Sequence, residues 1–272
     1  MFTAYKDAHV VVTGGANGIG KALALGFAKR GANVAVVDIH GDEAKAVAAE
    51  ITAMGCKSIA IQADVSVLDE CAKVYDTVMD AFGRCDVLVN DAGVSALSDV
   101  EHIPEKDLRW VFETNVYSHW FMMQKFLPQM RKQGTHCQIL NVCSIAGLIS
   151  MNGAPAYFSS KHAAVALSEC VYKQLKAENA NIDISIFCPG YVQTEMHLTD
   201  RHRPERFAIH DDEPYYHTEQ YAGMVAFNKM LLDSGAPLDI AVETIFTALE
   251  KEQFYICLLY TSDAADDLIG VD

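Results

Sequence analysis

The stretch His9-Val-Val-Val-Thr-Gly-Gly-Ala-Asn-Gly-Ile-Gly20 decides the fold, because a β-branched run passes through a glycine-rich turn into a helical pattern that continues to Lys29. Glycines permit a tight turn and let the backbone approach a ligand closely. The N-terminus of the following helix offers unpaired N–H groups to a phosphate. A glycine turn alone is a weak signal, but strand, turn and helix in this order predict a dinucleotide site.

Strand-like and helix-like segments alternate along the rest of the chain. Apolar runs predict further strands at Asn33–Val37, Ser58–Gln62, Asp86–Asn90, Cys137–Val142, Asp183–Phe187 and Phe254–Ile256. Helical patterns occupy Asp42–Met54, Val67–Phe82, Asp107–Lys132, Ala156–Asn179, Gln220–Asp233 and Leu238–Glu250. Buried strands joined by right-handed helical crossovers predict an α/β fold, a doubly wound parallel sheet of the Rossmann-like kind, in a single domain.

Composition excludes several classes of protein. The formal net charge of −15 over 272 residues argues against binding a nucleic-acid backbone, which needs clustered basic residues. No apolar stretch is long enough to span a bilayer, and the start lacks the pattern of a secretory leader. The eight cysteines form no paired spacing, so reduced thiols and a cytoplasmic location are expected. The loop histidines fit no metal-ligand spacing, so no metal is expected: His197, His202, His210 and His217.

Asp38 follows the second predicted strand, 18 residues after Gly20. A carboxylate at this place accepts hydrogen bonds from the adenosine ribose and repels a 2′-phosphate. Ile39 and His40 supply no arginine for that phosphate, so NAD is favoured over NADP. Asp64 and Val65 follow the third strand, where they are expected to hold the adenine edge.

Tyr157-Phe-Ser-Ser-Lys161 places a phenol and an ammonium four residues apart, on one face of a helix. The positive charge favours the phenolate, so the tyrosine can act as a general acid or base. Ser144 lies just after a strand, 13 residues before Tyr157, where its hydroxyl can bind a substrate oxygen. This arrangement predicts the transfer of a proton to or from a substrate oxygen.

The chain resembles the short-chain dehydrogenase/reductase family, in its compact rather than extended form. The resemblance rests on TGGANGIG at 13–20, Asp38, Asp64-Val65, NDAG at 90–93, Asn115, Ser144, YFSSK at 157–161 and PGYVQT at 189–194. It implies a catalytic set of Asn115, Ser144, Tyr157 and Lys161, with Asn115 bending its helix and helping to hold a water that links Lys161 to solvent. It implies a cofactor site formed by Gly14, Asn17, Gly18, Ile19, Gly20, Asp38, Asp64, Val65, Asn90, Ala92, Gly93, Tyr157, Lys161, Pro189, Gly190, Val192 and Thr194.

One position departs from the family pattern, because Asp91 stands where the family usually has a second asparagine.

By family position the substrate pocket is lined by Ser95, Leu97, Ile149, Met151, Tyr191 and Met196, and Leu198–Tyr216 form a lid. This lining is mostly apolar, so an apolar secondary alcohol or ketone, alicyclic or steroid-like, is expected. The lid arginines leave an anionic substrate as an alternative: Arg201, Arg203 and Arg206. The alternatives are a 3-oxoacyl-type ketoreductase of lipid metabolism and a catalytically silent dinucleotide sensor. The resemblance also implies a dimer or tetramer that pairs the helices 107–132 and 156–179.

The last segment, Cys257–Asp272, contains no lysine or arginine and breaks the preceding pattern. It resembles a translated transposon-based sequencing adapter, since the codons TGT CTC TTA TAC ACA TCT GAC GCT GCC GAC encode residues 257–266. We therefore expect residues 1–256 to form the oxidoreductase domain and residues 257–272 to be an artefactual tail. Sequencing the gene from source DNA tests this expectation.

Overall fold

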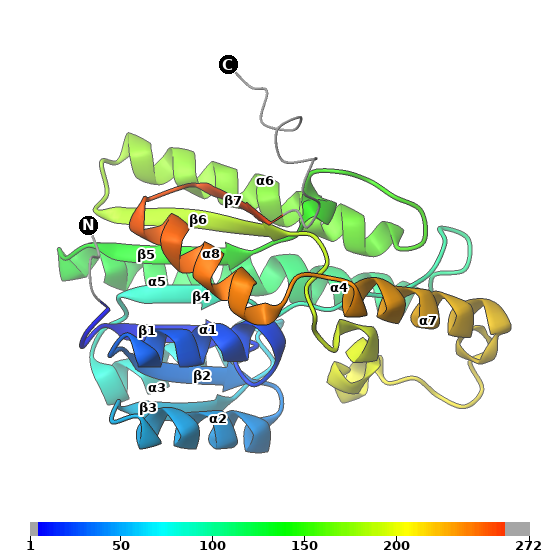
Figure 1. The fold of residues 1–272 in the computed structure, drawn as a ribbon, viewed down its shortest axis with the longest axis horizontal. Coiled ribbons are helices and arrows are strands. Elements are labelled where there is room, and N and C mark those ends of the chain that lie inside the picture. The colour runs from blue at the N-terminus through cyan, green and yellow to red at the C-terminus, as the bar shows by residue number, and fades with distance from the viewer. Residues whose placement is uncertain (1–4, 259–272) are drawn as a thin grey trace.

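One parallel sheet organises the described part of the chain, with strands in the order β3-β2-β1-β4-β5-β6-β7 (Figure 1). The computed structural model describes residues 5–258; residues 1–4 and 259–272 lie outside the described part. The strands are β1 (His9–Thr13), β2 (Asn33–Asp38), β3 (Ser58–Gln62), β4 (Val87–Asn90), β5 (Cys137–Val142), β6 (Ile182–Pro189) and β7 (Tyr255–Leu258). The strand order reverses between β1 and β4, where a ligand crevice is expected in open α/β sheets.

Two layers of helices cover the sheet. Apolar residues of α1 (Gly18–Lys29), α2 (Gly41–Ala53) and α8 (Leu238–Glu250) pack on one face. Those of α3 (Leu68–Phe82), α5 (Ser118–Gln133) and α6 (Pro155–Ala177) pack on the other. Both faces are therefore buried, which explains why the central strands are apolar throughout. The predicted doubly wound α/β fold is confirmed.

Most predicted elements agree with the observed bounds to within two residues, but the predicted helix Asp107–Lys132 is not continuous. It consists of α4 (Glu105–Phe112), a π-helical turn η1 (Glu113–Tyr117) and α5. A π-helical turn widens the backbone and is frequent at functional sites. Asn115 lies at the centre of this turn.

The polar region after β6 contains three short 3₁₀ segments, η3 (Met196–His202), η4 (Glu205–Phe207) and η5 (Pro214–His217). They lead into α7 (Glu219–Asp233), which projects beyond the carboxyl ends of the strands (Figure 1). This part of the chain covers the end of the sheet where a ligand is expected. Within residues 5–258, no helix is both long enough and apolar enough to cross a membrane.

The last described element is β7, which pairs in parallel with β6. The pairing runs from Ile186 opposite Tyr255 to Pro189 opposite Leu258. The last two residues of this strand belong to the segment that resembles an adapter. The rest of that segment, residues 259–272, lies outside the described residues, so the hypothesis of an artefactual tail stays a prediction.

Candidate active site

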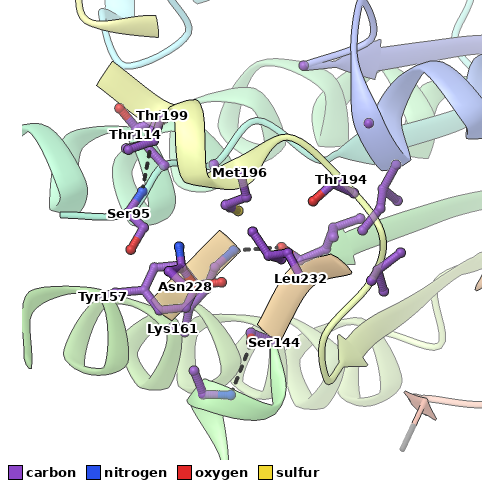
Figure 2. Close-up of a pocket in the computed structure, with 18 of the residues that line it drawn as sticks. Ser95, Thr114, Ser144, Tyr157, Lys161, Thr194, Met196, Thr199, Asn228 and Leu232 are labelled. Atoms are coloured by element: carbon purple, nitrogen blue, oxygen red, sulfur yellow. Dashed lines mark hydrogen bonds between the residues drawn. The ribbon is translucent and has the colours of Figure 1, made fainter. Parts of the chain in front are cut away.

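A cleft of about 630 Å³ lies at the carboxyl ends of the strands. It runs from the end of β2, past the glycine turn, to the space between α6 and α7. Figure 2 shows its catalytic end, where Tyr157 and Lys161 lie side by side on α6 below the loop that carries Thr194 and Met196. The cleft therefore joins the predicted cofactor residues to the predicted catalytic ones.

The glycine turn forms the floor of this cleft. Gly14 and Gly18 have φ angles of +64° and +53°, which few other residues adopt. A Cβ on Gly20 would lie 2.2 Å from the carbonyl oxygen of Gly14, so only glycine fits there. The first turn of α1 contains no acidic residue, so its positive end is open to a phosphate.

Asp38 ends β2 with its side chain turned toward the turn. It is 7% exposed. Its Oδ2 accepts a hydrogen bond from the backbone N–H of Ala16 at 3.0 Å, and its Oδ1 accepts one from the N–H of His40 at 3.0 Å. These two bonds fix the carboxylate at the wall of the cleft.

The residues predicted to be catalytic gather around the ends of β5 and β6. Lys161 is 2% exposed, and its Nζ donates to the carbonyl of Val142 at 3.1 Å and lies 5.7 Å from the ring centre of Tyr157. The Ser144 Oγ accepts from the N–H of Ala146 at 3.1 Å, which orients the hydroxyl at the end of β5. Because Ser144, Tyr157 and Lys161 all line the cleft, a substrate oxygen can meet the serine and tyrosine hydroxyls together.

Asn115 contributes to the site through hydrogen bonds to neighbouring residues and does not line the cleft. Its Oδ1 accepts from the N–H of Val94 at 2.8 Å, and its Nδ2 donates to the carbonyl of Val94 at 2.8 Å and to the Oγ of Ser160 at 3.0 Å. The side chain therefore ties the irregular segment after Gly93 to the helix that carries Tyr157. With both amide hydrogens bound to protein, this side chain positions the site rather than reaching into the cleft.

Asp91 is partly exposed in the cleft, and its carboxyl group lies against the glycine turn. A Cβ on Gly20 would lie 2.5 Å from its Oδ2, and its N–H donates to the Oγ1 of Thr13 at 3.1 Å. Burial raises the pKa of Asp91 to about 7, against the opposing effects of the Lys161 charge and a hydrogen bond from the Gly20 backbone. The departure from the family pattern thus places a titratable group in the wall of the cofactor cleft.

Most of the expected cofactor residues line the cleft, and two do not. The Asn90 side chain points between β4 and β5, where its Nδ2 donates to the Oδ1 of Asn141 at 2.8 Å. Gly20 lies under the turn. The others line the cleft: Gly14, Asn17, Gly18, Ile19, Asp38, Asp64, Val65, Ala92, Gly93, Tyr157, Lys161, Pro189, Gly190, Val192 and Thr194.

The substrate end contains all six expected pocket residues and several that the sequence did not indicate. Helix α7 contributes Met224, Phe227, Asn228, Leu231 and Leu232, and Trp110 and Thr114 come from α4 and η1. In Figure 2, Asn228 and Leu232 face the cleft across from Tyr157. The helical pattern of α7 was visible in the sequence, but its placement over the pocket depends on the irregular segment before it.

The histidines of the lid do not gather into a metal-like cluster in residues 5–258. Three ligand-type groups come together elsewhere, at His136, Asp183 and Glu252, on the edge of the molecule away from the cleft. The cleft itself presents hydroxyl, amide and backbone groups together with charged side chains such as those of Asp38, Asp91 and Lys161.

Comparison with known proteins agrees with this geometry. The short chain dehydrogenase family matches residues 8–205. A "CLA biosynthesis dehydrogenase/reductase" of Lactiplantibacillus plantarum is 36% identical over 252 residues, covering 93% of this chain and 88% of that protein. A "1-deoxy-11-beta-hydroxypentalenate dehydrogenase" of Streptomyces exfoliatus is 34% identical and covers 68% of each chain.

Among solved structures, a short chain dehydrogenase/reductase from Burkholderia phymatum in complex with NAD superposes with a TM-score of 0.89. It is 28% identical, over 93% of this chain and 89% of that one.

The fold and the cleft define an α/β oxidoreductase with a dinucleotide site. The chain belongs to the short-chain dehydrogenase/reductase family, as its sequence motifs predicted. The residues present fit the nicotinamide dinucleotide that this family uses, because glycines open the turn at the start of α1 and a fixed carboxylate stands at the far end of the cleft.

Proposed function

We propose that this protein is an NAD-dependent dehydrogenase that interconverts an apolar secondary alcohol and its ketone. The observation that carries the proposal is the presence of Ser144, Tyr157 and Lys161 at one end of a cleft whose other end holds the fixed Asp38 carboxylate. The relatives fit both directions of the reaction, since they include a 1-deoxy-11-beta-hydroxypentalenate dehydrogenase and a diacetyl reductase.

Asp38 supports NAD over NADP. Both of its oxygens already accept backbone hydrogen bonds, so the carboxylate cannot turn away from an incoming 2′-phosphate. Like charges held together in a partly buried cleft repel strongly. The NAD bound in the Burkholderia relative is consistent with this choice.

The chemistry divides between the cofactor and the protein. When bound, the nicotinamide supplies or accepts the hydride. In the oxidative direction, the Tyr157 phenolate takes the hydroxyl proton of the alcohol while the Ser144 hydroxyl donates a hydrogen bond to the same oxygen. The Lys161 ammonium stabilises the phenolate from the buried side of α6. Reduction reverses each transfer.

Replacing Tyr157 with phenylalanine tests the proposal. Turnover of NADH with a ketone is expected to fall by a factor of about 10³ or more, because the general acid is lost. NADH affinity, measured by fluorescence titration, is expected to change little. Tyr172→Phe, on the same helix, is the matched control and should retain turnover. An active Tyr157→Phe variant would refute the assignment.

The apolar substrate is argued from the lining of the catalytic end. Leu97, Met151, Phe227 and Leu231 surround the space beyond Tyr157, and the basic side chains of the lid are engaged in ion pairs. A panel of alicyclic, steroid-like and short polar ketones, each offered with NADH and with NADPH, tests substrate and cofactor together. Strong preference for a charged ketone would overturn the apolar assignment.

A 3-oxoacyl-type ketoreductase is the second candidate, because a 3-oxoacyl-[acyl-carrier-protein] reductase of Staphylococcus epidermidis is 34% identical over 187 residues. The acidic net charge and Asp38 disfavour an acidic carrier protein and NADPH. Activity with NADPH and an acyl-carrier substrate would favour this candidate. A silent dinucleotide sensor is disfavoured because the complete catalytic set is present.

A further inference from the structure

The lid crosses from the substrate end of the cleft to its opposite end. Segments η3 and η4 reach the loops that follow β2 and β3, which lie far from the catalytic tyrosine along the cleft. His202 Nδ1 is 2.9 Å from His40 Nε2, and the Arg206 Nη1 is 2.6 Å from the Oδ2 of Asp64. A cover for the substrate alone would not require these contacts.

A buried ion pair fixes the lid in this position. The Arg203 guanidinium donates to both oxygens of Asp107, at 2.6 and 3.1 Å, and both side chains are 4% exposed. The same guanidinium lies 4.2 Å from the ring centre of Trp110 and donates from Nε to Asp200 at 2.8 Å. In a bidentate ion pair of this kind, two parallel hydrogen bonds fix the orientation of the guanidinium relative to the carboxylate.

The contacts of His202 define its protonation. The Arg201 Nε donates to the Nε2 of His202 at 3.1 Å, and a guanidinium can only donate. Burial, and then the neighbouring His40 and Arg201, lower the pKa of His202, so the ring is neutral. The proton therefore lies on Nδ1 and is donated to His40, which holds the ring in one orientation.

His202 also lines the cleft, and its contact with His40 places it beside the wall formed by the ends of β2 and β3. That wall consists of two carboxylates with apolar neighbours: Asp38, Ile39, Ala63, Asp64 and Val65. Carboxylates accept hydrogen bonds from hydroxyl and amino groups, and the apolar residues suit a flat base. This is the chemistry of an adenosine site, and His202 closes its outer side.

We infer that His202 is a cofactor-binding residue, and that the lid forms the outer wall of the adenosine half of the site as well as the cover of the substrate. Arg206 acts indirectly, because it holds Asp64 and Ser66 in place through bonds of 2.6 Å to each. This inference rests on the proposed function for the identity of the dinucleotide.

One segment thereby contacts both halves of the cleft. At the start of η3, Met196 lines the substrate end, and the Thr199 Oγ1 accepts from the N–H of Ser95 at 3.2 Å. At its end, His202 lines the adenosine half. Occupancy of the adenosine half therefore stabilises the same segment that shapes the substrate pocket.

ADP-ribose tests this inference, because it contains the adenosine and pyrophosphate but no nicotinamide. Calorimetric titration is expected to show that His202→Ala weakens ADP-ribose binding about tenfold, the effect of losing one or two neutral contacts. His202→Gln, which can still donate a hydrogen bond to His40 and so keep the side chain at the wall, should recover part of the affinity. His210→Ala, an exposed lid histidine outside the cleft, is the control and should bind as the wild type does.

Equal affinity of the wild type and His202→Ala would overturn the inference, as would equal weakening in His210→Ala. Titration with 2′-phospho-ADP-ribose separates this result from the proposed function. If the wild type prefers the phosphorylated probe, the choice of NAD is wrong, and the His202 comparison with that probe still decides whether the lid forms the wall. Binding of neither probe overturns both.

Discussion

Asp91 shows how one residue changes the behaviour of a family site. Its carboxyl group is enclosed between the glycine turn and Lys161, and burial raises its pKa to about 7 while the nearby Asp38 adds to the rise. In the unfolded chain the same group titrates near its ordinary value of 3.8. Between these two values the native state holds a proton that the unfolded state has released.

The sign of the resulting pH dependence follows directly. A raised native pKa contributes stability that is complete below pH 3.8 and is lost as the pH rises through 7. Asp91→Asn removes this loss. Between pH 5 and 7 the free energy of unfolding of the variant is expected to rise, relative to that of the wild type, by about 1 kcal/mol per pH unit.

Urea unfolding at several pH values from 5 to 8 measures the difference. Asp80→Asn, on the exposed side of α3, controls for replacing a carboxylate by an amide. Parallel stability profiles for the wild type and Asp91→Asn would show that the Asp91 carboxyl is not protonated in the native protein.

At the scale of residues, the sequence predicted the positions of site residues that belong to one continuous motif. It predicted less well the positions that depend on how the strands pair in the sheet. Gly14, Gly18 and Asp38 follow from the local strand–turn–helix geometry, and they lie at the cleft. Asn90 belongs to a motif as well, but its side chain bonds to Asn141 on the neighbouring strand. The direction in which the side chain at the end of β4 points depends on the register between β4 and β5. A single sequence does not contain that register.

At the scale of elements, the lid depends on the Arg203–Asp107 pair. Arg203→Met is expected to cost about 3 to 5 kcal/mol in free energy of unfolding, because it leaves the Asp107 carboxylate buried without its partner. It is also expected to raise the KM for the ketone about tenfold, because η3 and α7 lose their anchor. Thermal unfolding and steady-state kinetics measure the two effects.

The double variant Arg203→Met/Asp107→Asn is the informative control. Since no unpaired charge remains buried, it should recover much of the stability while the KM stays raised. Stability that does not recover would show that Arg203 contributes through packing on Trp110 rather than through its charge.

The element scale also shows why parts of the site were not predictable. Hydrophobic periodicity gave β1, β3, β5 and α8 with their observed bounds, because these elements bury regular faces. It did not indicate the π-helical turn, although the family resemblance implied a bend at Asn115; there the side chain bonds to Val94, 21 residues away in the chain. Hydrophobic periodicity also did not predict the conformation of the lid, because the contacts of the lid join residues about a hundred positions apart, such as Arg203 and Asp107.

At the scale of the whole molecule, one surface is unusually free of charge. Helix α5 and the turn before it expose an uncharged stripe made of Tyr117, Trp120, Gln124 and Pro128. Helix α6 exposes a second uncharged stripe made of Ser159, His162, Ala166 and Cys170. A surface depleted in charge and enriched in aromatic residues is characteristic of a subunit interface. This surface supports the prediction that these two helices pair between subunits.

Trp120→Glu tests that prediction, because Trp120 is 54% exposed and an interface built on it would have to bury a carboxylate. Light scattering after gel filtration is expected to give a dimer or tetramer for the wild type and a smaller species for the variant. Val100→Glu is the control, since Val100 is 77% exposed and lies outside both stripes. An interface of the standard size, about 1,600 Å², loses enough affinity from one buried charge to dissociate at micromolar concentration. A monomeric wild type, or a Trp120→Glu variant of unchanged mass, would place the interface elsewhere or remove it.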